Sequence, residues 1–425
     1  MSRRAAGTGG PRSVAVLALL TVICLTSPTG TVAFAQGSAR AWGMGGAATA
    51  TARGLDAVDW NPANLALARP GFSLGLASLA ADLHNNAFTL SRYNEISGAT
   101  LTTADKQRLL QDIPAGGFAV QAEMRAAAGG LGVGNAALTF AVLGGGTGRM
   151  AKDFFDLVLM GNPIDRAFTF DGTGGEGYAI GAATLSAGVP LSTGYRTRLC
   201  AGTNLRYLRG LYELHFEEAT GGLVTTMDGI AGDARASYVT ANGGVGWAVD
   251  LGLTLQAPRG WTLGLACDNV RSAMDWNGDP QRRTWTARAD SLNASREDLD
   301  ALVAGSDTNV AVAPYRTTLP RRLRLGASNT YGPLLVALDV AQGLENRAGT
   351  TTRTEFRTGL EWGPCSWLLP RVGAALGGGA GRGASAGLGL RVGPWRLDVA
   401  AVNRGRFWPR DTKGLGIAAQ TRLEF

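Results

Sequence analysis

The side chains that most often perform chemistry are few and scattered in this chain. Its 425 residues include two histidines, His84 and His215. A Ser-His-acid hydrolase needs a serine nucleophile beside one of them, and no feature of the sequence nominates that serine. Neighbouring carboxylates such as Glu217 and Glu218 would point to opposite faces of a strand, so they would not form a general acid/base pair. We therefore expect no catalytic residues and no enzyme.

The sequence also argues against cofactor and nucleic-acid sites. The glycine-rich runs at 144–149 and 377–383 lack the Lys-Ser/Thr of a phosphate-binding loop, so we interpret them as turns. Cys200, Cys267 and Cys365 lie far apart, without the spacing of a metal site or a disulfide framework. No block of Lys and Arg with interleaved aromatic residues is present, so nucleic acid is not expected as a partner. We predict neither a cofactor nor a metal.

One apolar segment is the best lead to a binding function. The insertion between 144 and 175 contains Lys152–Met160, which is too apolar for an ordinary exposed loop. A surface that exposes so much apolar area needs a partner. The alternative is that a helix here only covers the structure beneath it. The residues concerned are Phe154, Phe155, Leu157, Leu159 and Met160.

The last eleven residues alternate between two kinds of side chain. Odd positions are mainly apolar and end in an aromatic residue, whereas even positions are mainly small or polar. This pattern is typical of the closing strand of a transmembrane β-barrel, and it predicts a signal for the outer-membrane barrel assembly machinery. The residues of this predicted signal are Leu415, Ile417, Leu423 and Phe425.

The same alternation recurs along the chain and predicts a closed barrel. In 245–256 and 353–362, one face is mainly apolar and the other is small or charged. Such runs extend over about nine to twelve residues, the length that a tilted membrane strand needs. After Gln36 no stretch reaches the ~18 apolar residues of a membrane-spanning helix, and a closed barrel satisfies its backbone hydrogen bonds between strands. We predict an all-β, antiparallel transmembrane barrel of about 14 strands, within a range of about 12–16.

Insertions interrupt the predicted strands. Thr102 to Asp112 is expected to form a short helix, because Thr102 and Asp105 have the spacing of a capping box. The segments 144–175 and 272–320 are expected to be long loops on the outer side of the membrane, and the second includes a short helix from Ser295 to Val303. A further strand is predicted at 84–92.

The N-terminal residues predict export. Three arginines precede an apolar run from 14 to 25, and an Ala-x-Ala cleavage site ends at Ala35. We therefore expect residues 1–35 to be a signal peptide, 36–70 a segment before the barrel, and 71–425 the barrel. Cleavage removes three of 40 basic residues and none of the 33 acidic ones, which leaves 37 − 33, or +4. The mature chain is thus nearly neutral for its length.

Two short motifs lie between the predicted cleavage site and the first strand. Their residues are Trp42, Gly43, Gly45 and Gly46, followed by Asp56, Trp60, Asn61, Pro62 and Asn64. The stretches Gly-Met-Gly-Gly-Ala and Trp-Asn-Pro-Ala-Asn-Leu-Ala resemble the N-terminus of the FadL-type outer-membrane transport superfamily, which includes PorV-like branches. The resemblance implies that this segment is a plug inside the barrel.

The types of the motif residues agree with a plug. Asn61 is expected to cap a helix that begins at Pro62. The glycines are expected to let the backbone pack closely against the lumen wall. Asn64 stands where relatives often have Gly, and we expect it to keep a turn by adopting a positive φ. Trp42, Asp56 and Asn61 are expected to hold the plug against charged lumen residues. Those residues are Arg353, Glu355, Arg357, Asp398 and Arg422.

The resemblance also implies a function. It implies a Gram-negative outer-membrane protein that passes hydrophobic or amphipathic small molecules passively, with the apolar insert as the landing surface and the plug rearranging afterwards. The lipid bilayer and the assembly machinery are the implied partners. The alternative is a PorV-like barrel that does not transport and serves protein secretion or envelope assembly. Transport predicts a continuous apolar tunnel from the insert to the plug, whereas docking predicts a sealed lumen.

Overall fold

The computed structural model describes residues 37–67, 71–193, 197–292, 304–347 and 350–425. The predicted signal peptide and the predicted helix from Ser295 to Val303 lie outside these residues. Within the described ranges, no helix combines the length and the apolar character needed to cross a bilayer.

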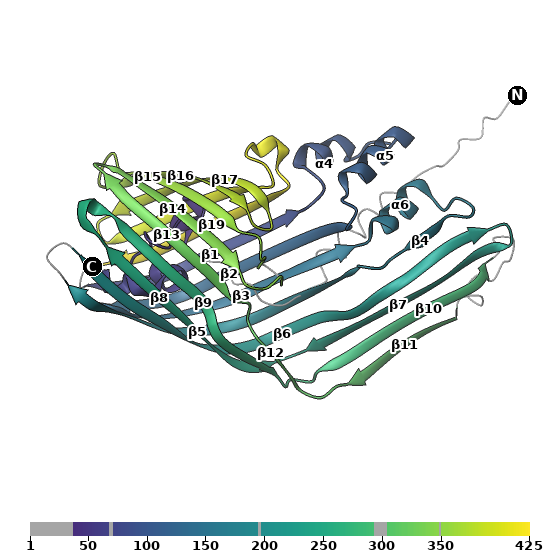
Figure 1. Cartoon of the computed structure of the whole chain (residues 1–425), viewed down its shortest axis with the longest axis horizontal. Coiled ribbons are helices and arrows are strands. Elements are labelled where there is room, and N and C mark those ends of the chain that lie inside the picture. The colour runs from purple at the N-terminus through teal and green to yellow at the C-terminus, as the bar shows by residue number, and fades with distance from the viewer. Residues whose placement is uncertain (1–36, 68–70, 194–196, 293–303, 348–349) are drawn as a thin grey trace, which may run out of the picture.

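Among the described residues, fourteen strands close into one antiparallel barrel (Figure 1). Successive strands of the ring are hydrogen-bonded to each other, and β19 pairs with β1 to close it. The predicted fold class and strand number are therefore confirmed. The ring consists of β1 (Phe72–Asn85), β2 (Phe118–Val133), β3 (Ala136–Met150), β5 (Gly174–Thr193), β6 (Arg198–Thr226), β8 (Gly244–Gln256), β9 (Thr262–Trp276), β13 (Arg322–Tyr331), β14 (Leu334–Gly343), β15 (Glu355–Trp362), β16 (Leu368–Gly377), β17 (Gly381–Val392), β18 (Trp395–Arg404) and β19 (Gly414–Glu424).

The two ends of the barrel differ. Short connections such as 134–135, 332–333 and 393–394 join the strands at one end, which we call the turn end. The longer segments leave and re-enter the barrel at the opposite end, which we call the loop end.

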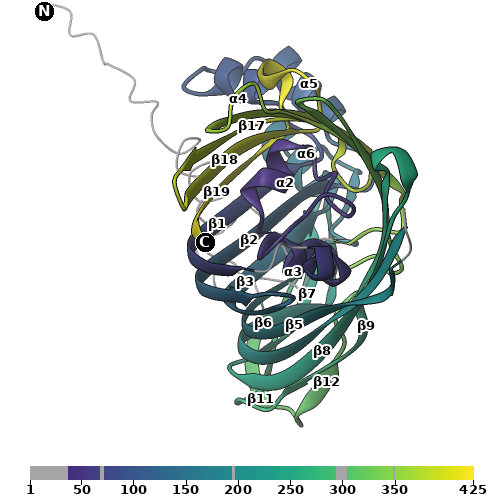
Figure 2. The ribbon, with the colours of Figure 1, turned by 90° about the vertical axis from the view of Figure 1, so that its left-hand side faces the viewer.

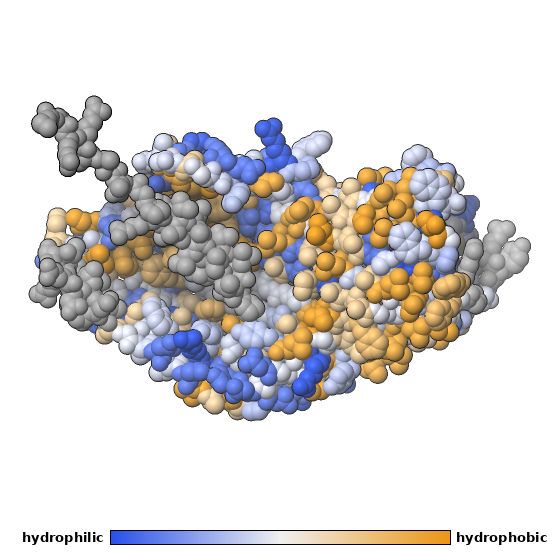
Figure 3. Space-filling model, turned by 180° about the vertical axis from the view of Figure 1, so that it is seen from behind, coloured by the Kyte–Doolittle hydropathy of each residue, from blue (hydrophilic) through white to orange (hydrophobic). Residues whose placement is uncertain are grey.

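Side chains alternate between the outer surface and the lumen, as the sequence pattern predicts. In β8, Trp247, Leu251 and Leu253 are between 42% and 48% exposed, whereas Asp250 is 1% exposed. Apolar side chains gather on the half of the outer surface nearer the turn end (Figure 3). Exposed aromatic side chains border this region at the turn end, as expected at a membrane interface. They are Phe72, Trp261, Trp362, Trp367, Trp395 and Phe425.

A sheet extension, which we call the wing, prolongs the wall beyond the loop end on one side (Figure 1). β6 is 29 residues long, and its far half pairs with β7 (Gly229–Ala241). β7 pairs with β10 (Gln281–Leu292), which pairs with β11 (Ala304–Ala311). The wing also includes β4 (Ala167–Thr169), while β12 (Tyr315–Thr317) continues along β9. Segment 272–320 therefore contains strands where the sequence interpretation had a loop, because β10 finds its partner in the distant β7.

Helices lie at the loop end (Figure 1). α5 (Thr103–Asp112) confirms the predicted helix and forms both hydrogen bonds of the capping box. α6 (Lys152–Met160) occupies the apolar insertion. The strand predicted at 84–92 is wrong, because β1 already ends at Asn85 and α4 (Leu90–Ile96) begins within the predicted range. Thr89 caps this helix by accepting a hydrogen bond from the backbone N–H of Arg92.

Candidate functional site: the plug and the loop-end cavity

Residues 37–67 lie inside the barrel, as the view from the turn end shows (Figure 2). They form α2 (Ala39–Gly43), α3 (Asp56–Trp60) and the 3-10 helix η1 (Pro62–Leu67). The side chain of Asn61 accepts a hydrogen bond from the backbone N–H of Ala63 at 3.1 Å, so it caps η1 as the sequence predicts. Gly45 and Gly46 have φ values of 64° and 81°, which side chains rarely tolerate. These local features fold the segment tightly enough to fit within the lumen.

Asn64 acts differently from the expectation. It lies within η1 and is not among the residues with positive φ in the described chain. Its amide is fully buried, donates to the carbonyl of Thr49 at 3.0 Å and accepts from the hydroxyl of Thr254 at 2.7 Å. The reason for an asparagine here is therefore its hydrogen-bonding side chain, which ties two parts of the plug to β8.

Glycines in the wall give the plug backbone room to lie against the strands. We call nine of them the glycine belt. A Cβ atom at any belt position would lie 2.8 Å or less from a plug atom, which is closer than real Cβ contacts occur. Several belt glycines are direct cross-strand partners, as Gly188, Gly202 and Gly252 are on β5, β6 and β8. The belt consists of Gly188, Gly202, Gly252, Gly264, Gly326, Gly359, Gly373, Gly387 and Gly416.

Wall side chains also hold the plug backbone directly. The buried carboxylate of Asp339 on β14 accepts hydrogen bonds from the backbone N–H groups of Ala48 and Thr49, at 3.0 and 2.8 Å. Ser385 on β17 donates to the carbonyl of Gly43 and accepts from the backbone N–H of Gly45. Because the plug is too short to satisfy its own backbone with regular structure, these contacts replace the missing partners.

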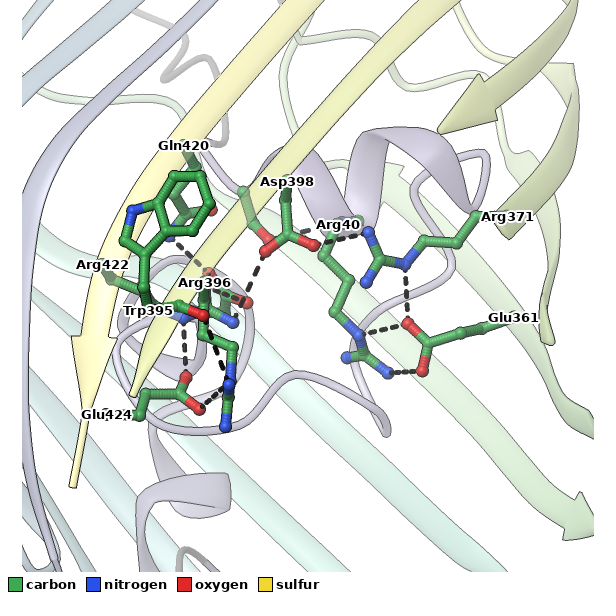
Figure 4. Close-up of polar contacts among 12 residues, drawn as sticks. Arg40, Glu361, Arg371, Trp395, Arg396, Asp398, Gln420, Arg422 and Glu424 are labelled. Atoms are coloured by element: carbon green, nitrogen blue, oxygen red, sulfur yellow. Dashed lines mark hydrogen bonds and ion pairs between the residues drawn. The ribbon is translucent and has the colours of Figure 1, made fainter. Parts of the chain in front are cut away.

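An ion-pair chain links the plug to the wall at both of its ends (Figure 4). It contains, in order, Arg40, Glu361, Arg371, Asp398, Arg422 and Asp56, with N–O distances of 2.8, 2.6, 2.6, 3.7 and 3.1 Å. All six side chains are 14% exposed or less. Burial lowers the pKa of the Arg40 guanidinium, but the carboxylates around it, Glu361 foremost and then Asp56 and Asp398, together raise the pKa above its usual value. The charge on Arg40 therefore persists inside the lumen.

The two plug tryptophans face arginines of the wall. The guanidinium of Arg404 lies 6.0 Å from the ring centre of Trp42, and those of Arg324 and Arg357 lie 5.3 and 5.8 Å from that of Trp60. Such distances are those of cation–π contacts. Both aromatic side chains are buried, so they help to fix the plug against the charged wall.

A cavity of about 150 Å³ lies between the plug and the loop end. Trp42, Gly45, Gly46 and Trp60 contribute its plug side. Its wall comes mainly from the loop-end halves of β1, β2, β14, β15, β17 and β18 and from the connections between β14 and β15 and between β16 and β17. The ionisable wall residues are Asp82, His84, Glu123, Arg322, Arg353, Glu355, Arg357 and Arg404. This lining differs from the apolar tunnel that the transport interpretation predicted, because the lumen-facing positions of these strands carry charges.

The five apolar residues of the insertion lie on α6 and just outside the barrel mouth. The rings of Phe155 and Phe118 are 5.5 Å apart, and those of Phe154 and Phe170 are 6.5 Å apart. Phe154, Phe155, Leu157 and Leu159 are thus half-buried, whereas Met160 is 37% exposed. The helix both covers neighbouring residues and presents an apolar edge.

The residues of the predicted assembly signal lie on β19 and at its end. Leu415, Ile417 and Phe425 are between 51% and 69% exposed, and Leu423 is half-buried. The ring of Phe425 lies 6.0 Å from that of Phe72 on β1. These positions place them on the outer surface where the barrel closes.

Sequence reasoning found part of this site. Of the residues expected to meet, Asp56 pairs with Arg422, and Arg357 donates to the carbonyl of Gly46 at 3.4 Å. Arg353 and Glu355 instead line the cavity. The roles of Arg40 and Asp339 were missed, as were the ion-pair partners of Glu361, which had been placed only on the charged face of the run 353–362. The signal that could have found Asp339 is its lumen-facing position in the alternating strand β14.

Comparisons with known proteins show the fold. No protein-family model matches the chain, and no curated protein matches its sequence. Among solved structures, a mutant of TodX, a monoaromatic hydrocarbon channel, matches with a TM-score of 0.52 and 13% identity, over 91% of this chain and 98% of that chain. The toluene transporter TbuX of Ralstonia pickettii matches with a TM-score of 0.50 and 15% identity, over 91% and 97%. The barrel fold implied by the sequence resemblance is therefore confirmed.

Proposed function

We propose, from the fold that this chain shares with a monoaromatic hydrocarbon channel and a toluene transporter, that it sits in the outer membrane and lets small hydrophobic or amphipathic molecules cross passively. The observation that carries the proposal is a plugged barrel with an apolar outer surface and a cavity at its loop end. A barrel of this kind exposes its apolar band to lipid, and its longer loops face the outside. The loop end is then extracellular and the turn end periplasmic. No covalent step is involved.

Transport and the PorV-like docking role are the two alternatives for this barrel. The solved structures that share the fold are named as channels or transporters, which favours transport. A Gram-negative host that lacks its own hydrophobic channels provides the test. Expression of the chain should increase the rate at which cells take up N-phenyl-1-naphthylamine, a probe that fluoresces in apolar surroundings.

The control for this test is a variant whose barrel folds but whose lumen is blocked. Heat-modifiable migration on a gel shows that this barrel has assembled. If cells that contain the folded barrel take up the probe no faster than the host without it, transport is rejected. Crosslinked partner proteins recovered under those conditions would favour docking instead.

We further propose that α6 captures ligand at the mouth. Val158 and Met160 are 43% and 37% exposed, so they form the accessible apolar edge of the helix. Met160→Asp should reduce probe uptake, because it places a charge on that edge without disturbing the packed rings of Phe154 and Phe155. The matched control is Met227→Asp, at an 84% exposed methionine on the wing. Equal uptake by the two variants would reject this role for α6.

A further inference from the structure

Strand register places two aromatic residues side by side on the outer surface of the wall. Tyr207 on β6 and Trp247 on β8 are direct cross-strand partners, and they are 54% and 43% exposed. At the turn end, the backbone N–H of Ala257 donates to the carbonyl of the exposed Trp261 at 2.8 Å. At about 3.3 Å per residue and a strand tilt of about 40°, the chain from Trp247 to Ala257 covers about 25 Å of the barrel axis. This is the height of the apolar band of such a barrel, so Tyr207 and Trp247 lie at the second membrane interface.

Two arginines flank this aromatic pair. Arg209 on β6 lies directly opposite Val245 on β8. Arg271 on β9 lies directly opposite Val249 on β8. Trp247 stands between these two valines and points to the same face, so each arginine is a diagonal neighbour of its ring and within reach of it. Both arginine side chains are exposed.

Arg209 and Arg271 differ from other exposed arginines nearby in their partners. Exposed arginines at the loop end and on the wing form ion pairs with carboxylates, at N–O distances between 2.5 and 3.2 Å. They are Arg235, Arg282, Arg283, Arg316 and Arg321. Within the ranges that the structure describes, the guanidinium groups of Arg209 and Arg271 have no ion pair and no hydrogen bond. An unpaired charge beside lipid hydrocarbon is costly, so a counter-ion from outside the chain would relieve it.

The chemistry of this patch fits a lipid phosphate. A guanidinium offers two parallel N–H donors that match the oxygens of a phosphate group. An aromatic ring at a membrane interface contacts acyl chains and keeps its polar end among the headgroups. Asp275, which lies opposite Val245 on the same face, already pairs with Arg316. The positive charges of the two unpaired arginines therefore remain available to an anionic headgroup.

We propose that Arg209, Trp247 and Arg271 form a binding site for the headgroup of a phosphorylated lipid of the outer leaflet. The arginines bind phosphate oxygens on two sides of Trp247, and the apolar surface towards the turn end receives the acyl chains. This inference goes beyond the proposed transport function and takes from it only the orientation in which the loop end is extracellular. Lipid bound here fixes the depth of the barrel on the side where β6 continues into the wing.

The test titrates the purified barrel in detergent with lipid A, a glycolipid that carries two phosphate groups, and measures the bound fraction by native mass spectrometry. The double variant Arg209→Gln/Arg271→Gln should bind lipid A at least about tenfold more weakly, because it removes both positive charges. The matched control Arg259→Gln/Arg391→Gln removes two exposed arginines at the turn end and should bind as the wild type does. Heat-modifiable migration verifies that both variants are folded.

Three results would overturn the proposal. The first is equal affinity of the two double variants for lipid A. The second is wild-type binding of enzymatically dephosphorylated lipid A that is as tight as binding of lipid A, because the acyl chains alone would then be recognised. The third is displacement of lipid A by an equal concentration of inorganic phosphate, because the site would then bind a free anion.

Uptake of N-phenyl-1-naphthylamine by cells is measured separately. Phosphate-dependent binding of lipid A by a barrel that does not increase uptake would reject the proposed transport function while the lipid site stands. Increased uptake without phosphate-dependent binding would reject the lipid site while transport stands.

Discussion

At the scale of single residues, the plug is held by charges that would be costly to bury alone. Asp56 is 3% exposed and both of its oxygens lie 3.1 Å from the same nitrogen of Arg422. Removing one partner of a buried ion pair costs about 3–5 kcal/mol. Asp56→Asn should stay near the lower end of that range, since Arg422 keeps its contact with Glu424 at 2.7 Å. The expected result is a loosened plug, measured as faster tryptic cleavage after Arg53 in the folded barrel.

The matched control is Asp275→Asn at the loop end of β9. Asp275 and its partner Arg316 are 48% and 66% exposed, and exposed pairs contribute only about 0–1 kcal/mol. Cleavage after Arg53 should not change in this variant. If the two variants are cleaved at the same rate, the Asp56–Arg422 pair does not hold the plug.

The residue-level predictions succeeded where the chemistry is local and failed where it depends on distant strands. Asn61 caps the segment that follows it, which its own sequence neighbours determine. The pairing of Arg40 with Glu361 joins residues 321 positions apart, so no local pattern could indicate it. Asn64 was correctly placed in the plug, but its partner Thr254 lies on β8, and the register of β8 against the plug is fixed only in the closed barrel.

At the scale of elements, the glycine belt predicts where the plug tolerates no added atom. A Cβ at Gly202 would lie 2.3 Å from atoms of Pro62 and Ala63, whereas one at Gly148 on β3 would meet nothing within 4 Å. Gly202→Ala should therefore push η1 away from β6 and open the lumen. Gly148→Ala should be neutral or slightly stabilising, because Ala loses about 0.5–1 kcal/mol less than Gly on ordering.

Ion conductance in planar bilayers measures whether an added Cβ atom at a glycine of the belt opens the lumen. The wild type and Gly148→Ala should be closed to small ions, and Gly202→Ala should show open-channel steps. Identical traces from all three proteins would mean that the belt does not seat the plug.

The capping box of α5 makes a second prediction for an element. The hydroxyl of Thr102 accepts from the backbone N–H of Asp105 at 3.2 Å, and the Asp105 carboxylate accepts from the backbone N–H of Thr102 at 2.9 Å. Thr102→Ala should cost the helix about 1 kcal/mol. Hydrogen exchange of the α5 amides should accelerate accordingly, with the exchange of the β-strand amides as the internal reference. Unchanged α5 exchange would contradict the role of the cap.

Strands could be predicted from the sequence wherever apolar residues alternate with small or charged residues. The runs in β8, β15 and β19 each place apolar residues outward and small or charged residues inward, as the structure does. The wing was not predictable in the same way, because both of its faces meet water or polar groups. In β10 the two sides carry arginines and threonines as well as Trp285, so no single face is marked as buried. Pairing with β7, and not hydrophobic patterning, makes it a strand.

At the scale of the whole molecule, the outer apolar surface predicts how the barrel sits in lipid. Leu251 on β8 is 48% exposed and belongs to this surface, and Val310 on the wing is 59% exposed. An arginine near the bilayer midplane costs about 2–4 kcal/mol. Leu251→Arg should therefore lower the free energy of unfolding from lipid vesicles by about that amount, and Val310→Arg should leave it nearly unchanged. Equal losses in the two variants would place the membrane elsewhere on the barrel.

β6 has a mechanical consequence for the molecule as a whole. One strand of 29 residues contacts the plug through Gly202, crosses the wall and supports the wing. Its hydrogen bonds to β5, β8 and β7 run perpendicular to its length. A pull along the wing is therefore shared by many bonds loaded in shear, and not taken by one bond at a time. Tension applied to the wing would reach the plug seat along this one strand, through the bulges at Leu211 and Glu217, where the strand can bend.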